Sequence, residues 1–368
     1  MLKDAIDFTK LRRVLVVKLR HHGDVLLTSP VFSVLKNHYP HLEVDALVYQ
    51  ETAEMLSLHP AISQLHTIDR TWKRQGLGFQ IAQEWALLKR LRARRYDLLV
   101  LLTEQWRGAL LKRALGIPYG VVADYGRRQS RFWQQSFTHI YPETRQRHKV
   151  EFHLDALRRL GLQPQADERA LSFVMTDADV SHVDVLLRHS GVAGPYVVLH
   201  PSSRWGYKCW EVDKYAELID RLMDAGHNLV LTGSSSKAEQ ALMQAIKVRV
   251  TRTPVDLSGK LTLKQLGAVI QRSACFVGVD SMPMHLAAAL DTPVVALFGP
   301  SSQAMWRPWT QRYEIVSSKP SCQPCFQHGC GSSEVSDCLR EIPVDRVFQA
   351  VIRFCGKTSR KIPALEAV

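Results

Sequence analysis

The amino-acid sequence predicts an α/β protein made of two Rossmann-like domains facing across a cleft. Short apolar runs alternate with longer amphipathic segments in both halves of the chain, as in β/α units that build parallel sheets. The length of 368 residues suits two domains with separate cores. A polar segment that contains a proline, residues 161–170, is typical of a linker. We therefore expect domains over residues 1–170 and 171–368, with a C-terminal helix that can pack back on the first domain.

The first half of the chain contains the expected alternation of strands and helices. Apolar runs suited to a buried parallel sheet predict its strands. These runs are residues 12–18, 43–49, 65–68, 97–102 and 121–122. Apolar residues at helical spacing predict its helices. These segments are residues 25–38, 81–93 and 148–160.

The second half repeats the pattern. Its expected strands are residues 196–200, 227–231 and 275–279, with a further strand that ends before the Gly-Pro at 299–300. Its expected helices are residues 210–225 and 262–272, one that follows the loop 232–236 and carries Glu239, and a short one after Asp280. Two such arrays in one chain are the main reason for predicting two Rossmann-like domains.

The turn after residue 279 is a candidate ligand site. Asp280 follows an apolar strand, and Ser281 precedes Pro283, which suits the first turn of a helix. Ligands of open α/β sheets bind beyond the carboxyl ends of the strands, and a helix N-terminus attracts phosphate. The simpler alternative is that Asp280 and Ser281 only cap the helix.

A second candidate site follows the first strand, at Gly23 and Asp24. Gly23 permits a tight turn or a close approach to a ligand. Asp24 is either the cap of the next helix or a carboxylate at the mouth of the sheet. The spacing Gly-x-Gly-x-x-Gly is absent here, which disfavours a nicotinamide-dependent nucleotide-sugar oxidoreductase.

Positive charge is concentrated in the first half of the chain. The net charge is +13, and residues 1–175 hold 27 Lys and Arg against 17 Asp and Glu, whereas the remainder holds 21 against 18. This imbalance indicates an anionic partner, or only scattered solvated side chains. Arg127, Arg128 and Arg131 stand beside two aromatic residues, as in a mobile loop that grips anions. A non-catalytic protein that binds nucleic acid or anionic lipid stays an alternative, although no nucleic-acid module is recognisable.

The chain contains no apolar run long enough to span a membrane and no signal-peptide core at its start. We therefore expect a cytoplasmic protein whose seven cysteines are reduced. Four cysteines are closely spaced near the C-terminus and could bind zinc or remain free. They are Cys322, Cys325, Cys330 and Cys338, and we favour the interpretation without metal.

Three parts of the sequence together carry a resemblance to a known family. They are residues 18–30 (KLRHHGDVLLTSP), the loop with Lys208 and Trp210, and residues 280–285 (DSMPMH) with the later Phe-Gly-Pro at 298–300. These parts resemble the ADP-heptose:lipopolysaccharide heptosyltransferases, which are glycosyltransferase family nine with the GT-B fold. The resemblance spans nearly the whole chain. The basic loop and the cysteine-rich segment are most similar to the core heptosyltransferase III branch.

The resemblance implies an enzyme that moves L-glycero-D-manno-heptose from ADP-heptose to a heptose of the lipopolysaccharide inner core, with no cofactor and no metal. It implies that Asp24 is the general base and that Lys208 neutralises the diphosphate of the leaving group. Further donor-binding residues are expected in or near the family motifs. They are Ser202, Ser203, Glu239, Asp280, Ser281, Met282 and His285, with Met282 in place of the usual glycine.

The acceptor implied by the resemblance is the phosphorylated inner core of lipopolysaccharide, bound by basic residues of the first domain. They are Arg20, Arg127, Arg128 and Arg131. Work on this acceptor implies peripheral contact with the anionic cytoplasmic face of the inner membrane, and no nucleic-acid partner. Another core heptosyltransferase of the family (I, II or IV) is the alternative within the same class.

Overall fold

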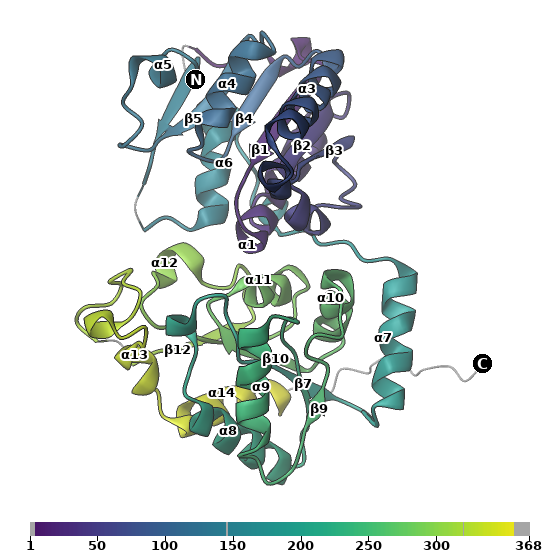
Figure 1. Ribbon diagram of the computed structural model, residues 1–368, viewed down its shortest axis with the longest axis vertical. Helices are drawn as coiled ribbons and strands as arrows, with labels where there is room; N and C mark the ends of the chain where they lie inside the picture. The colour runs from purple at the N-terminus through teal and green to yellow at the C-terminus, as the bar shows by residue number, and fades with distance from the viewer. Residues whose placement is uncertain (1–3, 145, 319, 357–368) are drawn as a thin grey trace. The chain divides into compact units, whose positions relative to one another are not determined.

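The computed structural model describes residues 4–144, 146–318 and 320–356. These residues form two compact units, divided after Val174 (Figure 1), where the sequence suggests a boundary at residue 170. Each unit contains one parallel sheet flanked by helices, which confirms the predicted α/β class. Within the described residues, no helix is both long enough and apolar enough to cross a membrane.

The first unit contains a six-stranded parallel sheet in the order β3-β2-β1-β4-β5-β6. Its strands are β1 (Arg13–Lys18), β2 (Glu43–Tyr49), β3 (Gln64–Ile68), β4 (Leu98–Leu101), β5 (Tyr119–Asp124) and β6 (His139–Pro142). Its α-helices are α1 (His22–Leu26), α2 (Ser29–His38), α3 (Leu77–Arg94), α4 (Trp106–Ala114), α5 (Arg131–Gln134) and α6 (Lys149–Arg159). Short 3-10 helices cover Phe8–Lys10, Gln50–Met55, Arg70–Arg74 and Asp167–Arg169.

The second unit contains another six-stranded parallel sheet, in the order β12-β11-β10-β7-β8-β9. Its strands are β7 (Tyr196–His200), β8 (Asn228–Leu231), β9 (Val255–Asp256), β10 (Cys275–Val279), β11 (Val294–Leu297) and β12 (Tyr313–Val316). Its α-helices are α7 (Asp177–His189), α8 (Val212–Asp224), α9 (Lys237–Lys247), α10 (Leu263–Gln271), α11 (Met282–Ala289), α12 (Gln303–Trp306), α13 (Asp337–Arg340) and α14 (Val344–Cys355). Short 3-10 helices cover Gly206–Lys208 and Cys330–Ser332.

The last helix, α14, packs on the sheet of its own unit. It contacts α8 and the strands β10, β11 and β12. Its residues Val347 and Val351 are fully buried in the second hydrophobic core. The side chain of Trp210 fixes the entry to this helix, because its indole nitrogen donates to the carbonyl of Ile342 (3.3 Å).

Both sheets have the same strand order when each is counted from its own first strand. In the first sheet the order reverses between β1 and β4, and in the second between β7 and β10. These central strands are buried on both faces, which explains their almost unbroken apolar sequences. Ligands of doubly wound sheets bind at such reversal points, beyond the carboxyl ends of the strands.

The helix expected over residues 25–38 is two helices, α1 and α2. Pro30 lies in the first turn of α2, where its missing N–H costs nothing, but it could not continue a helix from residue 26. The hydroxyl of Thr28 donates to the carbonyl of Val25 (2.6 Å) and closes the end of α1. The break leaves Asp24 inside a separate short helix after β1, whereas the sequence predicted that the first helix begins only at residue 25.

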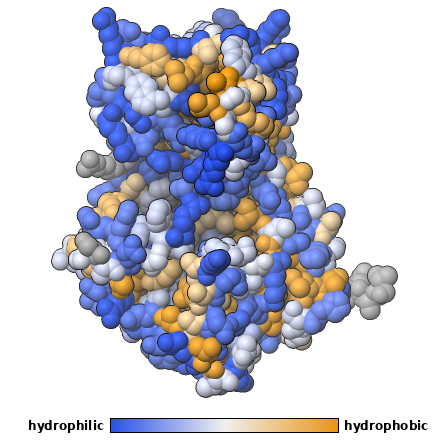
Figure 2. Space-filling view, in the orientation of Figure 1, coloured by the Kyte–Doolittle hydropathy of each residue, from blue (hydrophilic) through white to orange (hydrophobic). Residues whose placement is uncertain are grey.

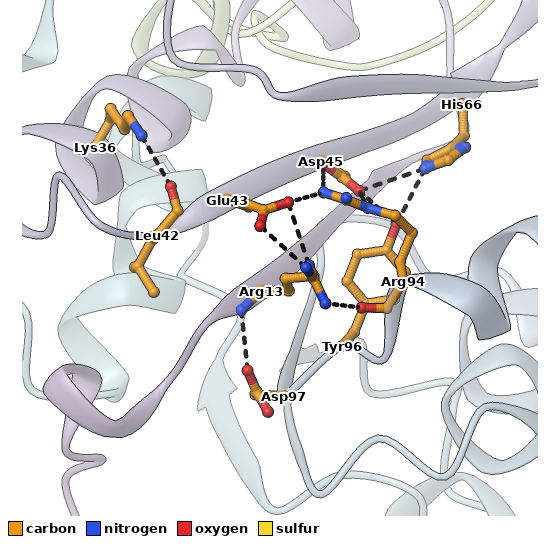
Figure 3. Close-up of polar contacts among 9 residues, drawn as sticks. All are labelled: Arg13, Lys36, Leu42, Glu43, Asp45, His66, Arg94, Tyr96 and Asp97. Carbon is orange, nitrogen blue, oxygen red and sulfur yellow. Dashed lines mark hydrogen bonds and ion pairs between the residues drawn. The ribbon is translucent and has the colours of Figure 1, made fainter.

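A buried polar network fixes the C-terminal end of α3 to β2 (Figure 3). Arg94 donates to Asp45 (Nε–Oδ2 2.7 Å) and to Glu43 (Nη2–Oε2 2.5 Å), and the hydroxyl of Tyr96 donates to Asp45 (2.7 Å). Burial alone would raise the pKa of Asp45, but hydrogen bonds from His66, Arg94 and Tyr96 lower it below the usual value. The carboxylate therefore stays ionised and holds Arg94 in place.

Candidate active site

In the first unit, Asp24 lies just beyond the carboxyl end of β1, at the reversal point of the sheet. The N-cap of its helix is His21, so the interpretation of Asp24 as a helix cap is wrong. Its carboxylate faces the amine of Lys18 (Oδ1–Nζ 3.9 Å), and 23% of its side chain is exposed. The group is thus close to a cation and still open to a substrate.

Lys18 is the last residue of β1 and is almost fully buried. Its amine donates to the carbonyl of Leu102 (3.0 Å) and lies 2.9 Å from Nε2 of His153. Burial lowers the pKa of Lys18 to about 8, although the charge of Asp24 opposes this shift. The amine is still mostly protonated at neutral pH and holds a positive charge beside Asp24.

His153 on α6 explains how a buried lysine keeps this position. Burial, together with the nearby charge of Lys18, lowers the pKa of His153 well below its usual value, so the ring is neutral. Its Nδ1 lies 3.1 Å from the carbonyl of Leu27 and donates to it, which leaves Nε2 as the acceptor for Lys18. Sequence reasoning missed both residues. A lysine inside a strand buried on both faces is a usable signal, but nothing local points to His153.

The predicted acceptor-binding arginines gather around Glu104, which follows β4. Glu104 accepts from Arg20 (Oε1–Nη2 2.8 Å) and from Arg127 (Oε2–Nε 2.5 Å), and its backbone carbonyl accepts from Arg128 (2.8 Å). The carboxylate of Glu104 therefore binds two guanidinium groups, and the backbone carbonyl of the same residue binds a third. Arg131, the first residue of α5, is exposed and has no hydrogen bond or ion pair to Glu104 among the described contacts.

In the second unit, Lys208 and Asp280 meet at the end of β10. The amine of Lys208 donates to Oδ2 of Asp280 at 2.6 Å, and their side chains are 21% and 7% exposed. The two residues are far apart in sequence, so the fold alone makes the pair. The N-cap residue of α11 is Ser281, so the interpretation of Asp280 as the cap of this helix is wrong.

The N-terminus of α11 follows directly. Ser281 is its N-cap residue, but its side chain makes no capping hydrogen bond. The Ser281 hydroxyl is buried and has no hydrogen-bond partner in the described part of the chain, a costly arrangement unless a ligand supplies one. Met282 opens the helix without a positive φ, so no glycine is needed there for backbone reasons. His285, one turn later, is buried with its ring 6.3 Å from that of Trp306.

A directed chain of hydrogen bonds leads to Glu239 on α9. Glu239 accepts from the Ser202 hydroxyl (2.5 Å) and the Ser234 N–H (2.9 Å). Because the single proton of Ser202 goes to Glu239, Nε2 of His200 (3.2 Å away) must donate to Ser202, and Nδ1 must accept from Thr232 (2.9 Å). Burial lowers the pKa of His200 to about 4, so its ring is neutral.

The same hydrogen bonds set the charge of Glu239. Burial alone would raise the pKa of this carboxyl group, but the bonds from Ser202 and Ser234 lower it below the usual value. Glu239 is thus an ionised carboxylate at the mouth of the sheet. Ser203, the remaining serine of the loop, is half-buried and accepts from the N–H of Trp205 (3.3 Å).

Both polar clusters of the second unit lie at its reversal point. His200 ends β7 and pairs with Gly278 of β10, two residues before Asp280. A side chain at position 278 would meet the His200 carbonyl at 3.0 Å and the Phe276 ring at 2.8 Å. Glycine is required at this position because the strands and the neighbouring ring leave no room for a Cβ atom.

The four closely spaced cysteines, here called the cysteine cluster, lie after β12. Cys322 and Cys330 are exposed, Cys325 is partly exposed and Cys338 is buried, all as free thiols. Burial, with the other three cysteines nearby, raises the pKa of Cys338 to about 11. Among the described residues, no three His, Cys, Asp or Glu side chains are arranged to hold a metal ion.

Comparison with known proteins agrees with this geometry. Residues 84–335, more than half of the chain, match the family described as Glycosyltransferase family 9 (heptosyltransferase). The chain belongs to this family. The family assignment made from its motifs is therefore confirmed, and the protein is a glycosyltransferase of the heptosyltransferase type.

Two relatives of this heptosyltransferase share one name with each other. This chain is 40% identical over 293 residues to Lipopolysaccharide heptosyltransferase 3 of Escherichia coli, covering 79% of this chain and 85% of the relative. It is 39% identical over 296 residues to the protein of that name from strain K12, covering 80% and 84%. Lipopolysaccharide heptosyltransferase 1 of Pseudomonas aeruginosa is less similar, at 28% over 325 residues, or 86% of this chain and 87% of that relative.

Solved structures show the fold. Escherichia coli ADP-heptose lps heptosyltransferase II matches with a TM-score of 0.74 at 20% identity, covering 93% of this chain and 98% of the other. Escherichia coli heptosyltransferase WaaC with ADP matches with a TM-score of 0.73 at 22% identity, covering 93% and 99%. The GT-B class expected for the heptosyltransferase is thus confirmed.

Proposed function

We propose that this heptosyltransferase moves a heptose from ADP-heptose to a heptose of the lipopolysaccharide inner core. Its similarity to two relatives named Lipopolysaccharide heptosyltransferase 3 supports this proposal. One structural observation carries the proposal: Asp24 and Lys208 each lie at the reversal point of their own sheet, where ligands bind. The higher identity to heptosyltransferase 3 than to heptosyltransferase 1 supports the third core heptose as the one added.

Asp24 would act as the general base. The acceptor hydroxyl must lose its proton as its oxygen attacks the anomeric carbon, and an ionised carboxylate can take that proton. Lys18 supports this role because its ammonium, held by Leu102 and His153, lies beside the carboxylate and helps to orient it. The base would thus be pre-positioned by Lys18, which His153 and the carbonyl of Leu102 hold in place.

The second unit would hold the donor. As the sugar–oxygen bond breaks, negative charge grows on the diphosphate, and Lys208 can neutralise it. The free N–H groups of α11 and the unpartnered Ser281 hydroxyl would bind phosphate oxygens. Asp280 would contact the heptose, with Met282 and His285 beside it, as in the family motif.

The nucleoside would bind around Glu239. An ionised carboxylate accepts hydrogen bonds from the paired hydroxyls of a ribose, and Ser202 and Ser203 add hydroxyl groups at the same loop. The donor is the only small molecule that the proposal requires, with no cofactor and no metal.

The first unit would bind the anionic acceptor. The carboxylate of Glu104 binds Arg20 and Arg127, and its backbone carbonyl binds Arg128. An acceptor phosphate can therefore exchange with this carboxylate, and Arg131 adds an exposed charge nearby. This role supports a peripheral position of the enzyme on the anionic cytoplasmic face of the inner membrane, because the acceptor of the reaction is anchored in the lipid.

The direct test incubates the purified chain with ADP-heptose and lipopolysaccharides truncated before the first, second or third core heptose, and detects addition by mass spectrometry. Addition of one heptose to the acceptor that lacks only the third supports the proposal, whereas addition to another acceptor, or none, overturns it. Asp24→Asn keeps the shape of the side chain and should lower kcat by about 100- to 10,000-fold. Its affinity for ADP-heptose should stay unchanged, because the base acts in the transition state.

A further inference from the structure

Helix α3 of the first unit carries an apolar stripe on its outer face. Leu77, Ile81 and Trp85 recur every fourth residue, and their exposed fractions are 79%, 57% and 63%. The inner face of the helix is formed instead by Leu87 and Leu91, which are 1% and 0% exposed. Single exposed apolar residues are common, but three large ones aligned on one helix face are not.

The apolar surface continues onto the neighbouring helices. Exposed side chains of α4 and α5 extend it, and Figure 2 shows hydrophobic side chains gathered over the elements labelled α3, α4 and α5 in Figure 1. The additional residues are Trp106 and Leu110 on α4, and Phe132 on α5. Glu84 of α3 forms a double ion pair with Arg107 of α4 (2.6 and 2.7 Å), which holds these two helices together.

Cations flank the stripe at both ends. The segment from residue 70 to residue 95 contains eight Lys and Arg but a single acidic residue, Glu84, which is bound to Arg107. Besides Arg92, which donates to the carbonyl of Ala114, five of the cations form no ion pair among the described residues and are exposed. They are Lys73, Arg74, Lys89, Arg90 and Arg95.

The stripe is part of a fixed helix and not of a segment waiting to fold inward. At its C-terminal end, Arg94 is bound to the buried Asp45 and to Glu43 (Figure 3). Near its middle, the ion pair to α4 and the buried Leu87 set its rotation. The outer face is therefore presented ready-made, which removes the ordering cost of binding.

We propose that this face, formed by Leu77, Ile81 and Trp85 with the flanking cations, is the site at which the enzyme docks on an anionic lipid bilayer. Aliphatic side chains and a tryptophan between rows of Lys and Arg match the acyl boundary and the phosphate headgroups of such a surface. Nucleic acid fits less well, because exposed Leu and Ile gain nothing from a phosphate backbone. The inference deepens the membrane contact that is part of the function proposed above.

The apolar face lies next to the arginines that are proposed to bind the acceptor. The ring of Trp106 on α4 lies beside that of Phe132 (5.8 Å between ring centres), and Arg128 lies over the Trp106 ring (5.4 Å). The apolar face therefore borders the arginines proposed to bind the acceptor. Docking would bring those arginines to the headgroup level, where the sugar core of a lipid-anchored acceptor emerges.

The test measures binding of the full-length protein to vesicles of phosphatidylcholine with and without phosphatidylglycerol, by co-sedimentation. Wild-type protein should bind the anionic vesicles and not the neutral ones. The triple variant Leu77→Gln, Ile81→Gln, Trp85→Gln should bind them at least about 100-fold more weakly. The matched control, Val185→Gln with Val248→Gln, removes two exposed apolar residues of the second unit and should bind like the wild type.

Two further measurements separate this inference from the enzyme's function. Transfer to a soluble, deacylated acceptor should be unchanged in the triple variant, whereas transfer to the acceptor embedded in vesicles should fall. Failure of transfer in every protein, with vesicle binding as described, would count against the proposed function alone. Equal vesicle binding by wild type and triple variant would overturn the docking site.

Measurements on the wild-type protein and on single variants test the proposal even if the triple variant does not fold. Brominated phosphatidylglycerol should quench part of the tryptophan emission, and Trp85→Phe should lose that part while still binding vesicles. Absence of quenching overturns the proposal. Binding of duplex DNA without binding of vesicles would also overturn it. The same holds if the protein binds no vesicles but forms a dimer in light scattering that the single variant Ile81→Gln dissociates.

Discussion

Replacing Lys18 with methionine should remove a pH dependence from the stability of the first unit. Burial lowers the pKa of this lysine to about 8 in the folded chain, against about 10.5 for a free lysine. Between these values the unfolded chain carries a proton that the folded chain has released. The free energy of unfolding of the wild type therefore increases as pH rises through this window. The contribution of Lys18 to this free energy is lowest below pH 8.

The size of the effect follows from the shift. A difference of about 2.5 pKa units corresponds to about 3 kcal/mol at 1.36 kcal/mol per unit. The free energy of unfolding of the wild type minus that of Lys18→Met should thus rise by about 3 kcal/mol from pH 8 to pH 10.5. Other titrating groups occur in both proteins and cancel in this difference.

The assay is urea unfolding of both proteins at several pH values from 7 to 10.5. Two compact units can unfold in separate steps, so the transition compared is the one that the substitution moves. Lys36→Met is the control, because Lys36 also donates to backbone carbonyls but from a partly exposed position (Figure 3). A constant difference between wild type and Lys18→Met across this range would refute the buried, proton-releasing state of Lys18.

The remaining predictions concern binding and the cysteines. Lys208→Ala should weaken ADP binding by about 10- to 100-fold in calorimetry, and unchanged affinity would remove this lysine from the donor site. Glu239→Gln should raise the KM for ADP-heptose and leave kcat nearly unchanged, because a contact to the ribose is equally strong in the bound ground state and in the transition state. A fall in kcat alone would contradict this role. Neutralising Arg127, Arg128 and Arg131 should raise only the acceptor's KM, as added salt should; equal damage to donor binding would disprove the role. Serine in place of the two exposed cysteines of the cysteine cluster should leave turnover and melting temperature nearly unchanged, with no stoichiometric zinc by elemental analysis; loss of turnover in a folded protein on chelation would contradict a structural cluster.

Local sequence was sufficient for the central strands of both sheets and for part of the site. The apolar runs of the central strands predicted β1, β4, β7 and β10, because a strand buried on both faces must be apolar throughout. Pro283 after Asp280 located the start of α11, since proline suits only the first turn of a helix. Pro30 gave the same signal for α2, and the break before it was missed because the apolar spacing continues across it.

Only the tertiary structure determined which polar groups meet. Lys18 and His153 are 135 residues apart, and Lys208 and Asp280 are 72 residues apart, so no local pattern relates their side chains. The gathering of three arginines at Glu104 likewise needs β1, β4 and the segment after β5 side by side. Helical spacing shows that α3 is a helix, but its outer face is known only once its neighbours are placed. Sequence periodicity records the direction of each side chain relative to its own element, whereas burial, charge pairing and pKa depend on atoms that distant segments bring within a few ångströms.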